Sequence, residues 1–277
     1  MKRHHSPRAA PPSILVAGLT LMLAACSDST SPSVVEPLTF KPDPIVTQAQ
    51  LQTALTTALS STNGGLDFPM WATVVDRAGV VVAVAFSGPA VDDQWLGSRA
   101  ISAQKANTAN DFSLDNFALS TANLFSAVQP GGSLYGLQAS NPVDPAVVYG
   151  GDMSQYGTVK DYMVGKKPGG VNVFGGGLAL YDATTGEVIG AVGLSGDTSC
   201  ADHNIAWRVR HALNMDNVPA GVAGAVGTNP VGKDNIIFDI VSGKSASGFG
   251  HPTCLAGAAD STRGTNLPTT YPLGPTP

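Results

Sequence analysis

Two cysteine and histidine pairs in the second half of the chain have spacing suited to metal binding. Cys200 lies three residues before His203, and His251 lies three residues before Cys254. Two thiolates and two imidazoles are a ligand set for tetrahedral zinc. The same cysteines could instead form a disulfide, which would bring His203 near His251. The redox compartment of the protein decides between these two interpretations.

The start of the chain has the features of an export signal. It is basic, with Lys2, Arg3 and Arg8. Residues 14–23 form an apolar run that is too short to span a bilayer, and small residues follow it. Residues 23–26, Leu-Ala-Ala-Cys, resemble the lipobox of bacterial lipoproteins, in which the cysteine is acylated and becomes the first mature residue. We therefore predict that residues 1–25 are removed and that Cys26 carries the lipid; the alternatives are an ordinary secretory signal and a buried helix.

Export would place the mature protein in the cell envelope, anchored in the membrane by its lipid. Ser27 after the acylated cysteine resembles the pattern that directs lipoproteins to the outer membrane, and residues 26–44 are typical of a flexible tether. With Cys26 acylated, only Cys200 and Cys254 remain. An oxidising compartment favours a disulfide between them over zinc.

The composition predicts one globular domain with tails. Of the 277 residues, 43% are hydrophobic and 13% are charged, so the chain has enough apolar side chains for a core and is not disordered, collagen-like or a coiled coil. The net charge of -5 argues against a phosphate-binding surface. Nucleic acid is therefore not expected as a partner.

The first half of the predicted domain alternates helices with a hairpin. Thr47 and Gln50 fit a capping box, and leucines at four-residue spacing follow them, which predicts a helix over 48–61. Two β-rich runs, 70–75 and 80–86, flank a four-residue turn and predict a hairpin. Helices are expected over 94–110 and 120–128.

The second half contains a long insertion and a second hairpin. Residues 131–170 are rich in glycine and proline, and loops of this length are often functional. Strands are expected over 171–181 and 187–195, and their glycines indicate close approach by packed helices or by a ligand. Asp202 fits the cap of a last helix. Residues 236–241 fit an extra strand and 255–277 a disordered tail, so the pattern predicts an antiparallel sheet flanked by helices.

Several segments in order resemble the GlcG/HbpS family, which includes haem-binding proteins. They are residues 75–79, 98–99, 105–109, 174–177, 186–196 and 202–206. The resemblance implies an α/β (α+β) domain over 45–216 that is profilin-like, with three α/β/α layers and a five-stranded antiparallel sheet. Residues 217–254 would then be a C-terminal extension. The chain departs from the family pattern in its insertion and in the absence of histidine from its first helix.

The resemblance makes haem the expected cofactor and suggests residues to bind it. Haem needs an apolar slot, polar or basic groups for its propionates and an axial ligand on iron. His203 is the first candidate for iron, at the mouth of a cavity enclosed by the glycine-lined sheet edge and the last helix; His251 is the second. Arg99 and Lys105 are candidates for the propionates, with a salt bridge or a solvated helix face as the alternative for each. Tyrosines 149, 156 and 162 would form a lid or pin the insertion to the domain.

We therefore expect a lipid-anchored envelope protein that binds haem or a related tetrapyrrole for sequestration, sensing or transfer. The alternatives are a small-molecule or haem-modifying enzyme that uses the same pocket, and a non-catalytic structural module. No catalytic residue is predicted, because P-loop, dinucleotide and Gly-x-Ser-x-Gly motifs are missing from the sequence. The resemblance further suggests homo-oligomers.

Overall fold

The computed structural model describes residues 45–222, 232–256 and 259–274. The expected signal peptide, Cys26 and the tether lie outside these residues. Within the described ranges, every helix is too short or too polar to cross a membrane.

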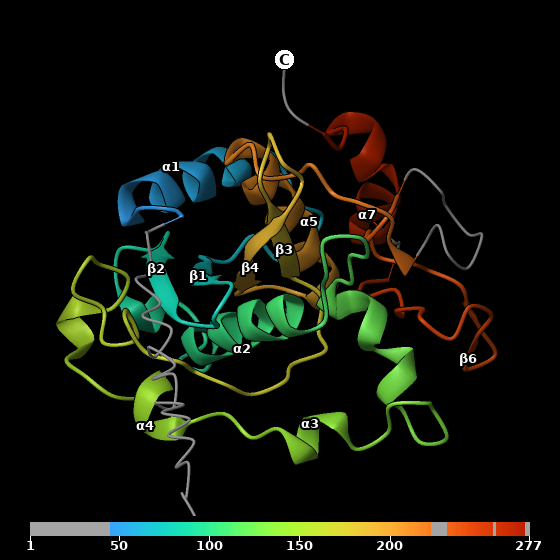
Figure 1. The fold of residues 1–277 in the computed structure, drawn as a ribbon, viewed down its shortest axis with the longest axis horizontal. Helices are drawn as coiled ribbons and strands as arrows, with labels where there is room; N and C mark the ends of the chain where they lie inside the picture. The colour runs from blue at the N-terminus through green and yellow to red at the C-terminus, as the bar shows by residue number, and fades with distance from the viewer. Residues whose placement is uncertain (1–44, 223–231, 257–258, 275–277) are drawn as a thin grey trace, which may run out of the picture. The chain divides into compact units, whose positions relative to one another are not determined.

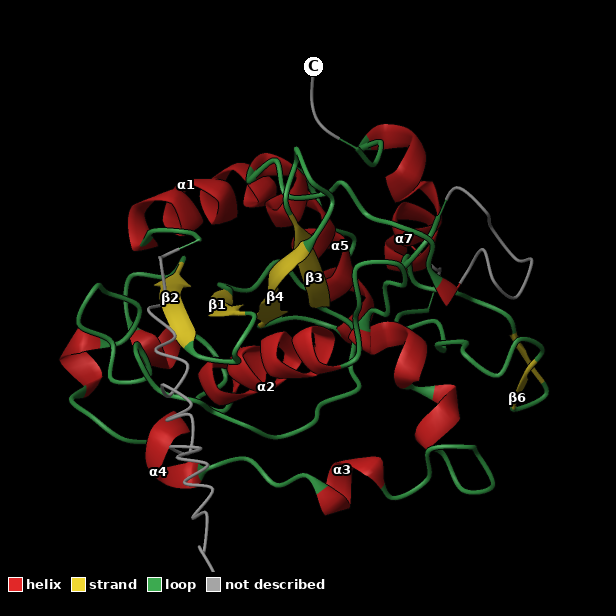
Figure 2. Ribbon diagram, in the orientation of Figure 1, coloured by secondary structure: helices red, strands yellow, loops and turns green. Residues whose placement is uncertain are grey.

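Four strands form one antiparallel sheet in the order β2-β1-β4-β3 (Figure 2). They are β1 (Trp71–Asp76), β2 (Val81–Phe86), β3 (Gly177–Tyr181) and β4 (Val188–Ser195). Both expected hairpins are confirmed. In the first turn, the Asp76 carboxylate accepts a hydrogen bond from the Val80 amide (2.9 Å), so the side chain and the strand pairing fix the same bend.

The expectation of a five-stranded sheet is wrong for the described residues, which contribute four strands to it. Residues 171–176 do not extend β3, because side chains bind their backbone amides: Thr108 Oγ1 accepts from Asn172 N (2.9 Å) and Asn172 Oδ1 from Phe174 N (3.1 Å). Residues 236–241 add no fifth strand either. Only Ile240–Val241 (β5) is extended, and it pairs with Lys244–Ser245 (β6) in a separate hairpin.

Helices cover both faces of the sheet, which gives the three α/β/α layers (Figure 1). On one face lie α1 (Gln48–Leu59) and α5 (Ser199–Ala212), and α7 (Ala259–Thr270) packs against α5. On the other face lies α2 (Ser98–Asp111). The expected capping box is present at the start of α1, where Thr47 and Gln50 bond to each other's backbone amides.

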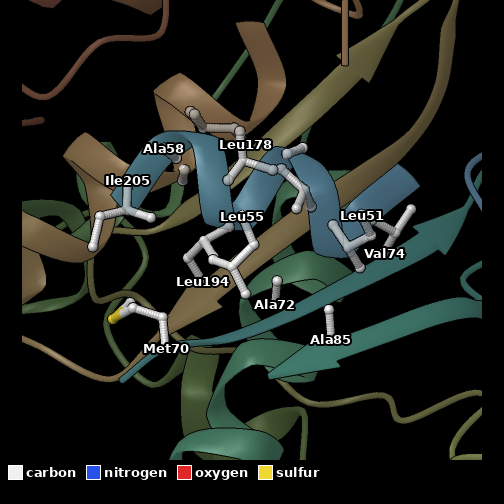
Figure 3. Packing of buried hydrophobic residues seen from close by; sticks show 14 of the residues in the cluster. Leu51, Leu55, Ala58, Met70, Ala72, Val74, Ala85, Leu178, Leu194 and Ile205 are labelled. Atoms are coloured by element: carbon white, nitrogen blue, oxygen red, sulfur yellow. The ribbon is translucent and has the colours of Figure 1, made fainter. Parts of the chain in front are cut away.

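The main core lies between the sheet and the α1/α5 layer (Figure 3). Leu51 and Leu55 of α1 are fully buried against Val74 of β1, Leu178 of β3 and Leu194 of β4. These strand residues alternate with side chains that face α2, as the two-residue period of a strand requires. The sheet is therefore buried on both faces.

The strand glycines are explained by helix packing rather than by a ligand. A side chain at Gly193 of β4 would collide with Ser102 O and Ala106 N of α2, and one at Gly177 of β3 would collide with Lys105 O. The small residues let the α2 backbone lie directly on the sheet. Close approach of a packed helix therefore explains the glycines at these positions.

Short elements fill the 112–170 region, where one α-helix was expected over 120–128. The chain instead forms two 3-10 turns, η2 (Thr121–Leu124) and η3 (Ser126–Val128). The insertion contains α3 (Leu137–Ser140), α4 (Pro145–Val148) and the 3-10 turn η4 (Met153–Gln155), and η1 (Val91–Asp93) precedes α2.

The expectation of a disordered tail over 255–277 is wrong for 259–270, which form α7. Gly264 and Pro268 give this segment a low intrinsic helix propensity, so its order comes from packing. Leu267 is buried in the main core. Side-chain amides of neighbouring segments also hold its carbonyls: Asn204 Nδ2 donates to Asp260 O (3.0 Å) and Asn235 Nδ2 to Gly264 O (2.8 Å).

Candidate functional site

Lys105 and Asp202 form a buried ion pair that joins α2 to α5 past the end of the sheet. Lys105 Nζ lies 2.6 Å from Asp202 Oδ2 and donates to Leu194 O (2.9 Å). Burial raises the pKa of Asp202 to about 6 and lowers the pKa of Lys105, and the attraction between them opposes both shifts. Lys105 is therefore engaged in the salt bridge that was the alternative to propionate binding. The expectation that Asp202 caps α5 is wrong, because the N-cap of this helix is Thr198.

Arg99 is likewise engaged, and it holds the insertion to α2. Its guanidinium forms a two-pronged salt bridge with Asp161 and donates to Val148 O (2.6 Å). The same group stacks 3.6 Å from the centroid of the Tyr156 ring. These partners occupy the guanidinium group. Arg99 therefore forms a salt bridge within the protein, which was the alternative to propionate binding.

His203 lies in the interior of the domain. The residue is fully buried, with Nε2 3.0 Å from Asn235 Oδ1 and 3.2 Å from Ile236 N, and Nδ1 has no partner among the described residues. Burial lowers its pKa to about 4, so the ring is neutral at pH 7. A haem iron could not reach this imidazole without displacing the packing around it.

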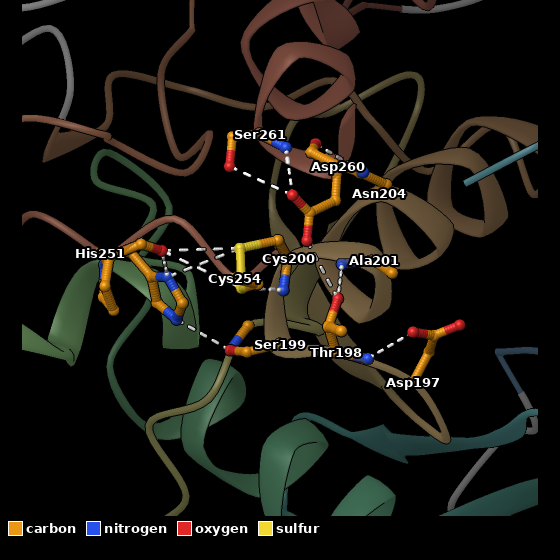
Figure 4. The surroundings of a disulfide bond; sticks show 12 residues. Asp197, Thr198, Ser199, Cys200, Ala201, Asn204, His251, Cys254, Asp260 and Ser261 are labelled. Carbon is orange, nitrogen blue, oxygen red and sulfur yellow. Dashed lines mark hydrogen bonds between the residues drawn. A yellow bond between two sulfur atoms is a disulfide. The ribbon is translucent and has the colours of Figure 1, made fainter. Parts of the chain in front are cut away.

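His251 is also buried, and both of its ring nitrogens have protein partners (Figure 4). Nδ1 donates to Pro252 O (2.7 Å), so Nε2 accepts from the hydroxyl of Ser199 (2.8 Å). Burial lowers its pKa to about 4. His251 thus positions Ser199, whose Oγ in turn accepts a hydrogen bond from Gly175 N (2.6 Å).

Cys200 and Cys254 form a disulfide in this structure, with their Cα atoms 6.0 Å apart (Figure 4). Ligand atoms of Cys200, Cys254 and His251 lie within 4.8 Å of one another, whereas His203 is outside this group. The disulfide uses both sulfurs, so it replaces the four-ligand zinc site. Chain-entropy arguments make a 54-residue loop closure worth about 4 kcal/mol.

The corner where a cavity was expected, between the glycine-lined sheet edge and the start of α5, is filled. A side chain at Gly175 would collide with Ser199 O, and one at Gly176 would collide with Leu194 O. Lys105, Asp202 and His203 occupy the space behind them. This corner has no room for a porphyrin ring, because backbone atoms of neighbouring segments pack directly against its glycines.

The buried histidines and Asp202 predict a pH dependence of stability. Below about pH 6.5 the unfolded chain protonates both histidines while the folded one does not, so stability falls by roughly 1 kcal/mol per pH unit for each down to about pH 4. Folded Asp202 takes up a proton below about pH 6 and offsets one histidine. The expected net contribution of these three groups on acidification is therefore a loss of roughly 1 kcal/mol per pH unit.

Urea unfolding at pH 6, 5 and 4 measures this slope. The variant His203→Gln removes one of the two titrating rings, so its stability is expected to be nearly independent of pH between 6 and 4. A variant whose slope equals that of the unmodified protein would show that His203 is protonated in the folded state.

An apolar cleft opens elsewhere, between the insertion and the segment before α2. We call it the aromatic cleft. It has a volume of about 190 Å³ and is lined by Trp71, Val91, Leu96, Arg99, Val148, Tyr149, Met153 and Tyr156. A second hollow of about 460 Å³, lined in part by Ser154 and Thr158, shares Val91, Met153 and Tyr156 with it. The two hollows therefore adjoin.

The walls of the aromatic cleft combine rigid rings with accessible donor atoms. Trp71 stacks on Phe86 with ring centroids 4.2 Å apart, and its buried indole N–H has no partner among the described residues. Tyr149 and Met153 are 62% and 53% exposed, so their hydroxyl and thioether are free for a ligand. Tyr156 is fixed by donation from its hydroxyl to Gly150 O (3.0 Å).

Sequence reasoning found only part of this cleft. Tyr149 and Tyr156 belong to the tyrosines expected to form a lid, whereas Tyr162 does not line the cleft. Trp71 and Met153 were missed. The available signal was the long aromatic insertion, but no pattern in the sequence shows that it folds back over Trp71.

Comparison with known proteins decides the family. The family model described as "Haem degrading protein HbpS-like" matches residues 46–210. This chain belongs to the HbpS-like family. The resemblance carried by the short segments is thereby confirmed, and the match extends from the start of α1 into α5. Cys254, His251 and α7 lie beyond the matched part of this HbpS-like chain.

Two solved structures are similar to the HbpS-like domain. One is a complex of PduOC with haem. The two sequences are 26% identical, and the match covers 60% of this chain and 91% of the PduOC chain with a TM-score of 0.42. The other is the Klebsiella pneumoniae protein ORFY, 27% identical, with coverage of 61% and 90% and a TM-score of 0.41. No curated protein matches the chain.

Proposed function

We propose that this protein binds haem or a related tetrapyrrole in the aromatic cleft. The observation that carries the proposal is the membership of residues 46–210 in a family described as haem-degrading and HbpS-like. We choose the aromatic cleft because it is apolar and open, whereas His203 and His251 are buried in protein packing. Flat aromatic walls suit a flat aromatic ligand.

The aromatic cleft, at about 190 Å³, is too small for a porphyrin by itself, so the ring would extend into the adjoining hollow of about 460 Å³. The residues suit haem in three respects. Trp71, Leu96 and Tyr156 supply apolar wall for the ring. The accessible Tyr149 hydroxyl and Met153 thioether are both known types of axial ligand. Ser154 brings a hydroxyl for a propionate in the adjoining hollow, in place of the expected Arg99 and Lys105. When bound, haem would supply an iron centre for ligand binding or redox chemistry.

A hemin titration of the chain lacking residues 1–26 tests the proposal. We expect a shifted Soret band that saturates at one haem per chain, together with quenching of tryptophan fluorescence as the cleft fills. Absence of a saturable band would end the haem proposal and leave a small-molecule enzyme or a non-catalytic structural module.

Haem modification is a second candidate, because the matching family is described as haem-degrading. The test adds ascorbate and oxygen to the haem complex. Loss of the Soret band with release of iron and an open-chain product would favour an enzyme. A band that persists as long as that of a haem–albumin control would favour sequestration, sensing or transfer.

We also propose that the protein is exported and held in the outer membrane by a lipid on Cys26. The support is the basic start, the short apolar run and residues 23–26 of the sequence. Intact mass of protein purified from its native membrane should show acylation and loss of residues 1–25, and Cys26→Ser should abolish both. An unprocessed or unacylated product would contradict the anchor.

Cross-linking of the purified protein would test the homo-oligomer suggested by the resemblance.

A further inference from the structure

A second groove lies between α5 and α7, away from the aromatic cleft. Its volume is about 430 Å³. Its lining combines apolar surface with polar and cationic groups and consists of Arg208, Ala259, Thr262, Arg263, Asn266, Leu267, Thr270 and Tyr271. Thr262, Asn266 and Thr270 follow at four-residue spacing, so α7 turns one polar stripe toward this groove.

Arg208 is the unusual member of this set, because its charge is buried without a carboxylate. Four lysine and arginine residues are buried among the described residues. Three of them, Arg99, Lys105 and Arg210, form salt bridges with Asp161, Asp202 and Asp234. Arg208, 8% exposed, has no such partner within the described ranges. Its charge is therefore the one that no carboxylate neutralises.

Backbone carbonyls satisfy part of the Arg208 guanidinium. Nη1 and Nη2 donate to Ser61 O and Thr62 O, respectively, both at 3.1 Å, and Nη1 also donates to Asn63 Oδ1 at 2.7 Å. These acceptors follow the end of α1, where a cation is favourable. They carry no full charge, and the Nε–H of Arg208 remains without a partner in the described structure.

A second cation faces the same groove. Arg263 is exposed on α7 and is close enough for its charge to add to burial in lowering the pKa of Arg208, while Tyr271 opposes the shift. The acid of this helix, Asp260, is directed elsewhere: its carboxylate accepts from Ser261 N (2.7 Å) and from Thr198 Oγ1 (3.2 Å). Two like charges thus share a groove that has no carboxylate in its lining.

We propose that this groove binds a small oxyanion, a phosphate or carboxylate group, between Arg208 and Arg263. The anion would neutralise both guanidinium groups, and the hydroxyl of Thr262 and the amide of Asn266 would complete its hydrogen bonds. The site is independent of the aromatic cleft and of haem.

Calorimetric titration of the chain lacking residues 1–26 with inorganic phosphate and, separately, with citrate tests the site, with sodium chloride at matched ionic strength as the blank. We expect saturable binding of one anion per chain. Arg263→Gln should weaken it about tenfold, the effect of losing one charge-assisted contact. Lys244→Gln removes one exposed positive charge on β6 and should leave the affinity unchanged.

The two anions distinguish the sources of the oxyanion. Binding of phosphate alone assigns the site to phosphorylated molecules, and binding of citrate alone assigns it to carboxylates. No binding of either above the chloride blank would overturn the proposal, as would equal affinities for Arg263→Gln and the unmodified chain. Arg208→Lys, which keeps the charge, should bind more weakly than the unmodified chain while it remains folded by circular dichroism.

Discussion

Replacement of Lys105 by methionine is expected to lower the free energy of unfolding by about 3–5 kcal/mol, because it leaves the Asp202 carboxylate buried without its cation. Methionine keeps most of the length of the side chain, so the loss reports on charge and hydrogen bonding rather than on volume. Urea unfolding at pH 7, where the carboxylate is ionised in the unmodified protein, measures the change.

The double variant Lys105→Met/Asp202→Asn is the matched control. It removes both charges and keeps the shape, so we expect it to recover more than half of the stability lost in Lys105→Met. Equal stability of the two variants would show that the loss came from packing of α2 on β4. A loss below about 1 kcal/mol in Lys105→Met would contradict the buried ion pair itself.

Removal of the disulfide in Cys200→Ala/Cys254→Ser is expected to cost about 2–5 kcal/mol. The bond ties the segment that carries His251 to the first turn of α5, and its loss releases a loop of 54 residues in the unfolded state. Alanine is chosen at the buried Cys200 so that no hydroxyl is buried, and serine at the half-buried Cys254. Urea unfolding with and without reductant measures the effect.

The reductant provides the control for this prediction. It should destabilise the unmodified protein by a similar amount and leave the double variant unchanged. If reductant has no effect on the unmodified protein and alkylation finds two free thiols under metal-free denaturing conditions, the disulfide is refuted and the zinc interpretation of the Cys/His pairs returns.

The local parts of the fold could be predicted from the sequence. The capping box at Thr47 and Gln50 and the turn at Asp76 depend on contacts within four residues, so their chemistry is visible in the order of the side chains. The same holds for both hairpins. In each hairpin a short turn joins the two strands, so their antiparallel pairing is local in the sequence.

The long-range parts could not be predicted. Lys105 and Asp202 are 97 residues apart, and each has an ordinary helical explanation by itself. The order of α7 was missed because its sequence is polar and contains Gly264 and Pro268; one leucine and the side-chain amides of Asn204 and Asn235 supply what propensity does not. The resemblance implied a fifth strand. It could not show that a side chain binds a backbone amide before β3, where Thr108 accepts from Asn172 N.

The candidate site shows the same division. The sequence indicates which residue types are present but not whether an imidazole faces a cavity or the core, so His203 and His251 were placed at a site that the structure fills with packed side chains. The aromatic insertion was recognised as a feature, whereas its partner Trp71 comes from a strand about 80 residues earlier in the chain than Tyr149. Only the fold brings them together.

The location of haem is tested most directly by comparing hemin affinities, from Soret titrations, of Tyr149→Phe/Met153→Leu, Tyr162→Phe and His203→Gln. The first removes the accessible donors of the aromatic cleft, and the second makes the same tyrosine change at a position of the insertion outside it. We predict at least about tenfold weaker binding for the first variant and unchanged binding for the other two. Unchanged binding by Tyr149→Phe/Met153→Leu together with loss of the Soret band in His203→Gln would contradict the aromatic cleft as the haem site.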